Sequence, residues 1–363
     1  MKKIFRLSSA LFLLFLFFNA AAQQEKIDYQ TISKIKDEAF NRSQVMDILF
    51  NLTDVVGPRL SGSTNLKNAQ VWAQKKLTEW GMENSNIEPW GGFGRGWEVQ
   101  KSYIAMTVPY YQSLIAIPKA WTPGTNGLIS GNVVIVKIET EQDFEKYKGT
   151  LKGKIVIVSP IQSVVLGLKP DARRYTTEEL HDIYMDKSLD EKTENRQAEN
   201  PAQLKKMREL RLKINPFLLE EGAAVLISSR GGIMGTFFTT NGASYATNAK
   251  PVLPELEMGS EHINRLIRLL EAGKEVTLEA EIKTEFSDKD TMQYNVIAEI
   301  PGTDKNLKSE LVMIGAHLDS WHAATGTTDN AAGSAVMMEV MRILKAIDVK
   351  PRRTIRIALW SVE

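Results

Sequence analysis

The chain has 363 residues, of which 43% are hydrophobic and 25% charged, a composition typical of a globular protein with a large core. At about 100–200 residues per domain, this length predicts two domains, or one domain interrupted by an insertion. The 45 basic and 44 acidic side chains nearly cancel, so we expect no nucleic-acid partner, because such proteins need a clustered basic face. The absence of cysteine excludes disulfides, thiolate zinc sites and cysteine nucleophiles. With only four histidines, any metal site must depend mainly on carboxylates.

The first 22 residues are typical of an export signal. A short basic start is followed by an apolar run from residue 7 to 18, and three alanines beginning at Ala20 then offer the small residues that signal peptidase cuts. The apolar run is shorter than the ~20 residues that span a bilayer, which argues against the alternative of a membrane anchor. We therefore expect cleavage near residue 22. The mature protein should be exported, periplasmic or extracellular, with no stable membrane anchor.

Helical periodicity follows in the next segment. Apolar side chains spaced three or four apart from Leu66 to Trp80 predict one helix, with Ser63 or Thr64 as its N-cap and Gly81 as its stop. The loop that precedes this helix is rich in turn-forming residues. It is therefore expected to lie between two helices rather than within one.

The middle of the chain, from about residue 113 to 284, has a different pattern of predicted secondary structure. Short β-rich runs recur there, at 132–138, 154–158, 223–227 and 276–282. The charged stretch 171–211 within this region predicts a solvated helical excursion, with a substrate-shaping lid as the alternative. A further helix is expected, with Ser260 as its cap and Gly273 as its stop.

The final block predicts an α/β unit. Residues 294–300 and 311–316 are predicted strands, 331–347 a helix, and 354–360 a strand. A strand, a helix and a strand in this order form a right-handed unit with parallel strands. We therefore expect an α/β fold with a largely parallel central sheet flanked by helices. Functional groups should lie at the carboxyl ends of its strands.

Two of these predicted strands end in residues that can bind a metal or move a proton. His317 and Asp319 are two apart, so an extended chain directs both to one side, and Asp319 can accept the second ring N–H of a metal-bound His317. Asp329 lies beside the start of the helix, and its two oxygens can bridge two cations. Glu363 follows the last strand and can accept a proton from an attacking water. Each residue alone has an ordinary explanation, such as a helix cap or a core histidine, but the combination predicts a catalytic metal centre.

Three nearby residues are open to two interpretations. Arg59 lies in the loop before the first helix described above, and Trp321 follows closely after Asp319. Both are candidates for substrate contact, with packing at the surface as the alternative. His322 lies in the same loop as Trp321 and is expected to be polar surface.

The stretch from His317 to Glu363 resembles the di-zinc exopeptidases that have a bacterial leucyl aminopeptidase-like catalytic domain, and most of all their carboxypeptidase Q (plasma glutamate carboxypeptidase) branch. The resemblance rests on His-Leu-Asp-Ser-Trp, on Thr-Asp-Asn-Ala-Ala-Gly-Ser-Ala-Val-Met-Met-Glu and on Arg-Arg-Thr-Ile-Arg-Ile-Ala-Leu-Trp. The loop at residues 57–63, Gly-Pro-Arg-Leu-Ser-Gly-Ser, is similar to the family's N-terminal segment. The runs at 153–158 and 221–226 resemble the protease-associated domain that interrupts the catalytic domain in this family. Nearly all of the mature chain is covered.

This resemblance implies a role for each candidate residue. His317 would be a ligand of one of two zinc ions, and Asp329 would bridge both. Asp319 would orient His317, and Glu363 would be the general base. A cis peptide bond would join Asp329 to Asn330.

The resemblance also implies a domain organisation and a substrate. A signal peptide (1–22) would precede the N-terminal part of the peptidase domain (23–112), a β-rich protease-associated-type insertion with the helical excursion (113–284) and the catalytic part of the peptidase domain (285–363). The substrate would be a peptide or dipeptide, and a homodimer is compatible with the family. The preference for one peptide end over the other stays open.

The remaining zinc ligands of the family would follow residue 363. We therefore expect the catalytic domain to be C-terminally truncated, so that this polypeptide alone binds zinc weakly and hydrolyses little. Two alternatives are a non-catalytic, receptor-like binding protein with the peptidase fold and a one-zinc acyltransferase resembling glutaminyl cyclase. The presence of all four site residues argues against the first, and the protease-associated-type insertion argues against the second.

Overall fold

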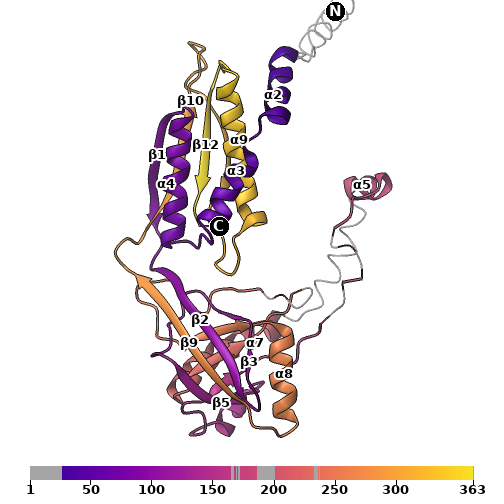
Figure 1. Ribbon diagram of the computed structural model, residues 1–363, viewed down its shortest axis with the longest axis vertical. Helices are drawn as coiled ribbons and strands as arrows, with labels where there is room; N and C mark the ends of the chain where they lie inside the picture. Colours follow the sequence, from indigo (N-terminus) through magenta and orange to yellow (C-terminus); the bar gives the residue numbers. More distant parts are fainter. Residues whose placement is uncertain are drawn as a thin grey trace, which may run out of the picture.

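Two β-sheets organise the chain in its computed structural model (Figure 1). The structure describes residues 27–164, 167, 168, 170, 172–185, 201–232, 236 and 238–362. The expected export signal and Glu363 lie outside these residues. None of the helices in the described ranges is long and apolar enough to cross a membrane.

The smaller sheet has four strands in the order β1 (Glu83–Gly92), β10 (Met292–Ile300), β12 (Thr354–Trp360) and β11 (Leu311–His317). β11 and β12 are parallel, whereas β10 runs antiparallel to both of its neighbours. The predicted α/β class is therefore confirmed, but the expectation of a largely parallel sheet is wrong, because this sheet is mixed. The helix α9 (Ala332–Ala346) supplies the long crossover that parallel strands need, while the short connection at 301–310 simply reverses the chain between β10 and β11.

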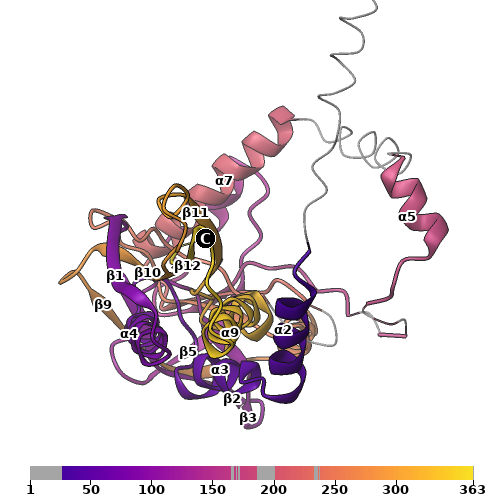
Figure 2. The ribbon, with the colours of Figure 1, turned by 90° about the horizontal axis from the view of Figure 1, so that it is seen from above.

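Helices pack on one side of the smaller sheet (Figure 2). They are α2 (Tyr29–Asn41), α3 (Val45–Phe50) with the π-helical turn η1 (Asn51–Val55), α4 (Thr64–Glu79) and α9. The predicted helix at 66–80 is confirmed as α4, and its N-cap is Ser63, whose Oγ accepts a hydrogen bond from the Leu66 N–H at 3.2 Å. Its apolar stripe is buried against β10 in one core cluster.

The larger sheet has eight strands in the order β3-β2-β9-β5-β6-β7-β8-β4. Their bounds are β2 (Gly96–Val108), β3 (Gln112–Ser113), β4 (Ala116–Pro118), β5 (Ile129–Ile135), β6 (Ile155–Ile157), β7 (Val225–Ser228), β8 (Glu255–Met258) and β9 (Thr277–Ser287). The helical segments associated with this part are η2 (Glu141–Lys146), α5 (Thr177–Tyr184), α7 (Pro201–Glu220) and α8 (Ser260–Glu271). β5 to β8 are parallel, and α8 contributes its apolar face to their core.

The chain crosses between the two sheets twice, from β1 to β2 and from β9 to β10 (Figure 1). The larger sheet thus begins at Gly96 and ends at Ser287, somewhat outside the predicted insertion at 113–284. The predicted division into domains itself stays a prediction. β12 points toward the larger sheet in Figure 1, and β11 runs parallel to it. The loops that follow these two strands therefore meet the larger sheet, which is where the candidate residues lie.

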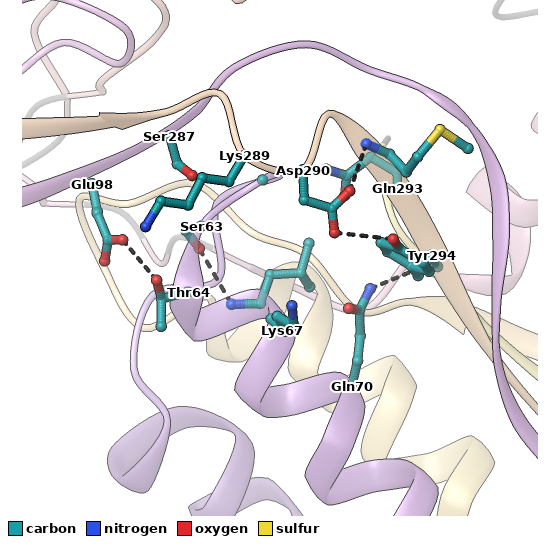
Figure 3. Close-up of a pocket in the computed structure, with 13 residues that line it drawn as sticks. Ser63, Thr64, Lys67, Gln70, Glu98, Ser287, Lys289, Asp290, Gln293 and Tyr294 are labelled. Atoms are coloured by element: carbon teal, nitrogen blue, oxygen red, sulfur yellow. Dashed lines mark hydrogen bonds between the residues drawn. The ribbon is translucent and has the colours of Figure 1, made fainter.

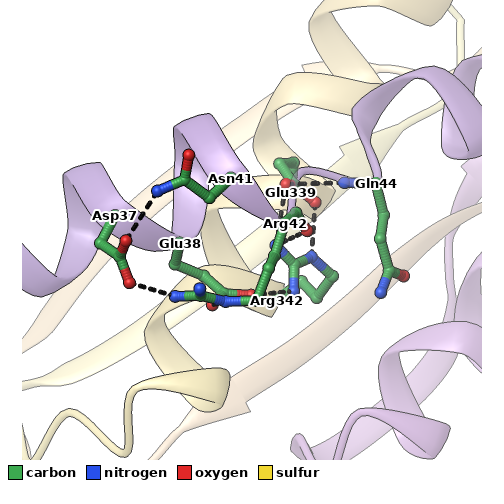
Figure 4. A network of polar contacts seen from close by, with 7 residues as sticks. All are labelled: Asp37, Glu38, Asn41, Arg42, Gln44, Glu339 and Arg342. Atoms are coloured by element: carbon green, nitrogen blue, oxygen red, sulfur yellow. Dashed lines mark hydrogen bonds and ion pairs between the residues drawn. The ribbon is translucent and has the colours of Figure 1, made fainter.

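A buried ion-pair network joins α2 to α9 (Figure 4). The Arg342 guanidinium donates to Glu38 Oε1 at 2.8 Å and to Glu339 Oε2 at 2.7 Å, and all three side chains are buried. Its Nη2 also donates to the carbonyl oxygen of Arg42 at 3.1 Å. Arg342 therefore pairs with two carboxylates that have little access to water.

We expect Arg342→Met to lower the melting temperature by roughly 5–10 °C, because it leaves the buried Glu339 without its cation and removes the buried partner of Glu38. The matched control is Arg42→Met. Arg42 also pairs with Glu38, and with Asp37, but its side chain is half exposed, so its loss should cost under about 2 °C. Thermal unfolding followed by circular dichroism measures both. Equal losses for the two variants would contradict this assignment.

Candidate active site

A pocket of about 250 Å³ lies where the loops after β11 and β12 meet the larger sheet. It is lined by Leu60, Ser61, Phe93, Trp121, Asn241, Tyr245, His317, Asp319, Ser320, Trp321, Asp329 and Val362. Three predicted site residues, His317, Asp319 and Asp329, are thus brought together. Val362 is the last described residue, so the chain reaches this pocket just before Glu363, which lies outside the described residues.

His317 stands between two carboxylates at the end of β11. Its Nε2 lies 3.1 Å from Asp329 Oδ1, and its Nδ1 lies 3.4 Å from Asp319 Oδ1. Its backbone carbonyl accepts a hydrogen bond from Ser334 Oγ at 2.9 Å, which ties the strand end to α9. The two ring nitrogens thus have different neighbours. This is the arrangement in which one nitrogen can bind a metal while a carboxylate on the other fixes the tautomer.

Asp319 is itself held by the loop at residues 57–63. Its Oδ2 accepts a hydrogen bond from Ser61 Oγ at 2.8 Å, and Asp319 is buried. Two further bonds link the same loops, from the Ser320 N–H to the Arg59 carbonyl and from the Arg59 N–H to Ser320 Oγ, each at 3.0 Å. The sequence analysis missed Ser61, because nothing local indicates that this loop reaches the end of β11.

Arg59 is placed behind the pocket. Its side chain is 0% exposed, and its guanidinium donates to the carbonyl oxygens of Leu52, Gly57, Leu318, Thr325 and Gly326 at 2.7 to 3.1 Å. Burial lowers the pKa of Arg59 to about 10, and the charge of Asp319 opposes this effect, so the group is protonated at neutral pH. Arg59 does not line the pocket. The structure therefore shows a brace between loops, and the predicted contact of Arg59 with substrate gains no support from it.

Asp329 lies in the turn η4 (Thr327–Ala331), where the chain enters α9. Its side chain is 71% exposed, and the Asp329–Asn330 peptide bond is cis, as the family resemblance implies. The preceding Gly326 has a φ of +61°, and a Cβ there would lie 2.3 Å from the Cβ of Ser320. Only glycine fits at this position. The turn can therefore close against the loop after β11 and bring Asp329 to His317.

The donor atoms fit part of a zinc site. His317 Nε2 and Asp329 Oδ1 face each other, and imidazole nitrogen and carboxylate oxygen are both ligands of zinc. Within the described ranges, no group of three or more His, Cys, Asp or Glu residues is arranged to hold a metal ion. The described residues thus supply two ligand atoms and an orienting carboxylate, where a complete site has about four ligands.

Aromatic side chains form the opposite side of the pocket. Trp321, a predicted candidate for substrate contact, lines it and is 44% exposed. Phe93, Trp121 and Tyr245 line it from the segments next to the larger sheet. The sequence analysis missed these three because they are far apart in the chain and belong to no common motif. Only their three-dimensional proximity identifies them.

The environment of His322 differs from the expected polar surface. Its ring is partly buried, with Nε2 2.7 Å from the carbonyl oxygen of Pro118 and the ring edge-on to Trp97 at 5.0 Å between centroids. Burial lowers the pKa of His322 below its ordinary value. The expectation of polar surface is therefore wrong, because the neighbouring larger sheet covers this loop. His322 does not line the pocket at His317.

A second cavity lies at the N-terminal end of α4 (Figure 3). Charged side chains of both signs line it, among them Lys67, Lys289, Glu98 and Asp290. None of the predicted site residues contributes to it. The pocket at His317 is the better candidate active site, because polar groups that can bind a metal or transfer a proton converge there on one point.

Comparison with known proteins gives a consistent picture. The model of "Peptidase family M28" matches residues 295–363. Carboxypeptidase Q of Mus musculus is 23% identical over 359 residues, which cover 93% of this chain and 66% of that protein. Carboxypeptidase Q of Rattus norvegicus is 24% identical over 366 residues, which cover 94% of this chain and 67% of that protein.

Among solved structures, a peptidase M28 precursor from Shewanella amazonensis SB2B is similar in fold, with a TM-score of 0.57 and 24% identity over 91% of this chain and 66% of that chain. The chain thus spans about two thirds of the length of these relatives. The matched family segment contains β11, η4 and α9, and with them His317, Asp319 and Asp329. Residues 295–363 are therefore similar to peptidase family M28, and the chain is similar over most of its length to carboxypeptidase Q.

Proposed function

We propose that the protein is an exported, zinc-dependent exopeptidase that hydrolyses the terminal peptide bond of short peptides or dipeptides. One observation carries the proposal. At the carboxyl end of β11, His317 lies between Asp329 on one ring nitrogen and Asp319 on the other, inside a pocket. The match of residues 295–363 to the model of peptidase family M28 supports the same chemistry.

In this proposal His317 and Asp329 would hold zinc through the ring Nε2 and a carboxylate oxygen, which face each other. Bound zinc would supply Lewis acidity, polarising the scissile carbonyl and making water a better nucleophile at neutral pH. Asp319 keeps the ring of His317 in one orientation, and Ser61 in turn holds Asp319 through its hydrogen bond.

Glu363 is the proposed general base. Its carboxylate accepts a proton from the water whose oxygen attacks the carbonyl carbon. The same proton then passes to the amine nitrogen as the C–N bond breaks. The second proton of the water leaves when the new carboxyl group ionises, so the products are a carboxylate and an amine. Val362 at the pocket wall supports this role, because the next residue along the chain is Glu363.

Export and domain organisation complete the proposal. The basic start, the apolar run and the alanines of residues 1–22 support export. The region at 113–284 would be a protease-associated-type insertion that shapes access to the pocket, since part of the pocket wall comes from it. A homodimer is compatible with these features.

Removing and restoring zinc tests the function. The full-length gene product is purified, treated with a chelator, dialysed and resupplied with zinc, while amino-acid release from dipeptides and bound metal are measured. We expect hydrolysis to disappear with the metal and to return with zinc. Glu363→Gln should keep its zinc and lose about 10²-fold or more in kcat.

Two results would contradict the proposal. One is wild-type protein that binds no zinc under these conditions. The other is dipeptide binding without any hydrolysis by the zinc-loaded protein, which is expected of a receptor-like binding protein. A single zinc per chain with cyclisation of N-terminal glutamine would instead indicate the acyltransferase alternative.

A further inference from the structure

Four aromatic side chains form one wall of the pocket that holds His317. This aromatic wall consists of Phe93, Trp121, Tyr245 and Trp321. Phe93 stacks on Tyr245 with 4.2 Å between ring centroids, and Trp121 contacts Tyr245 at 5.3 Å and Trp321 at 6.5 Å. The rings thus form one continuous apolar surface.

The centre of the aromatic wall is rigid and strained. Trp121 is only 6% exposed, and its φ of +60° is rare for a bulky residue. Its indole N–H donates to the carbonyl oxygen of Arg95 at 3.0 Å, and the N–H and Oγ of the buried Thr122 both donate to the Lys119 carbonyl oxygen. Strain of this kind persists where the surrounding structure enforces it, and it is concentrated at functional sites.

The backbone of the neighbouring Tyr245 is held just as closely. The Arg95 N–H donates to the carbonyl oxygen of Tyr245 at 2.7 Å. Gly94 permits this approach, since a Cβ there would lie 2.3 Å from the same oxygen. Tyr245 is nonetheless 41% exposed and Trp321 is 44% exposed. The wall therefore presents fixed aromatic surface to the pocket instead of burying it in a core.

The charges of the pocket indicate which side chains it accepts. The described lining residues include no lysine or arginine, so an acidic side chain would find no cationic side chain beside the aromatic wall. The carboxylates of Asp319 and Asp329 both face His317. Aromatic and large aliphatic groups gain most from burial against such rings.

We infer that the aromatic wall is the specificity pocket for an aromatic or large aliphatic side chain beside the scissile bond. This inference rests on the proposed exopeptidase function. It assigns substrate selection to Phe93, Trp121 and Tyr245, which come from segments next to the larger sheet. Selection is thereby separated from the residues proposed to hold zinc.

The test is equilibrium binding of free amino acids, which are the products of exopeptidase action at either peptide end. The zinc-loaded full-length protein is titrated with L-phenylalanine, L-glutamate and L-lysine, and the quenching of tryptophan fluorescence is followed. We expect L-phenylalanine to bind about tenfold tighter or better than the other two. Tyr245→Ala and Trp321→Ala should each remove most of this preference.

Tyr111→Ala is the matched control. Tyr111 is an exposed tyrosine that precedes β3 and does not line the pocket, so the preference should stay intact in this variant. Equal affinity for the three amino acids in the wild type would overturn the inference, as would an unchanged preference in both pocket variants. Trp121→Phe, which keeps an aromatic ring, should retain the preference, and circular dichroism of each variant shows whether a loss of preference comes with unfolding.

Dipeptide hydrolysis, measured on the same samples, separates the two proposals. Selective binding of L-phenylalanine without hydrolysis of any dipeptide supports the aromatic wall as a specificity pocket and contradicts the proposed exopeptidase function. Hydrolysis of Phe-Ala, Glu-Ala, Ala-Phe and Ala-Glu at equal kcat/KM supports the function and defeats the specificity pocket.

Discussion

Replacing His317 with alanine is expected to lower kcat/KM for dipeptide hydrolysis by about 10³-fold or more, because Lewis-acid stabilisation of a transition state amounts to several kcal/mol. His317 supplies the only imidazole among the described residues that line the pocket. Its loss removes one of the two facing atoms that are proposed to bind zinc, and it leaves Asp329, whose side chain is largely exposed, without its partner. Zinc content, measured by inductively coupled plasma mass spectrometry after gel filtration, should fall in parallel with activity.

Graded variants distinguish a ligand from an orienting residue. Asp319→Asn keeps the shape of the side chain and removes its charge, so zinc affinity should fall by about 10–100-fold, less than for His317→Ala. Ser61→Ala removes only the bond that holds Asp319 and should have a smaller effect still. His181→Ala is the matched control, since His181 is exposed on α5. Unchanged zinc content in His317→Ala would exclude His317 as a ligand.

Arg59→Met is expected to lower the free energy of unfolding by about 3–5 kcal/mol, because each buried carbonyl that loses its donor costs about 1–3 kcal/mol and several are affected. The carbonyl oxygens involved belong to the segments on both sides of the pocket, around Leu52 and Gly57 and from Leu318 to Gly326. The same change should loosen the loop after β11. Urea denaturation measures the first effect, and hydrogen–deuterium exchange of residues 318–326 measures the second.

Two arginine variants make this prediction specific. Arg59→Lys keeps the charge but cannot reach five oxygens, so its loss of stability should be intermediate. Arg95→Met breaks a partly exposed pair with Asp288 at 2.7 Å and a cation–π contact with Phe286, and should lower stability by only about 1–2 kcal/mol. If Arg59→Met were no more destabilising than Arg95→Met, the proposed bracing role of Arg59 would be wrong.

Local patterns in the sequence predict several elements well. The apolar stripe and the Ser63 cap give α4 nearly to the residue, and the strand predicted at 354–360 is β12. β1 is missed, because Glu83–Gly92 is polar and contains Pro89, with none of the alternation of a strand. Its pairing with β10 overrides this weak local propensity. The mixed sheet is missed for the same reason, since strand direction depends on partners distant in the chain.

Local sequence patterns likewise predict only part of the candidate site. The spacing of His317 and Asp319 is local, and the sequence predicts that they meet on one side of the chain. Ser61 and Arg59 come from a loop that lies far from these residues in the chain. The hydrogen bond from Ser61 to Asp319 joins residues 258 apart, and the one from Arg59 to the Leu318 carbonyl joins residues 259 apart. The aromatic wall gathers rings from four separate segments. Such contacts are set by packing between the two sheets, which no motif in the sequence encodes.

Anomalous diffraction at the zinc edge, from crystals of the zinc-loaded full-length protein, tests the central claim most directly. The account predicts an anomalous peak at bonding distance from both His317 Nε2 and a carboxylate oxygen of Asp329, about 2.0–2.2 Å from each. A bound zinc ion elsewhere, with His317 and Asp329 free of metal, would contradict it.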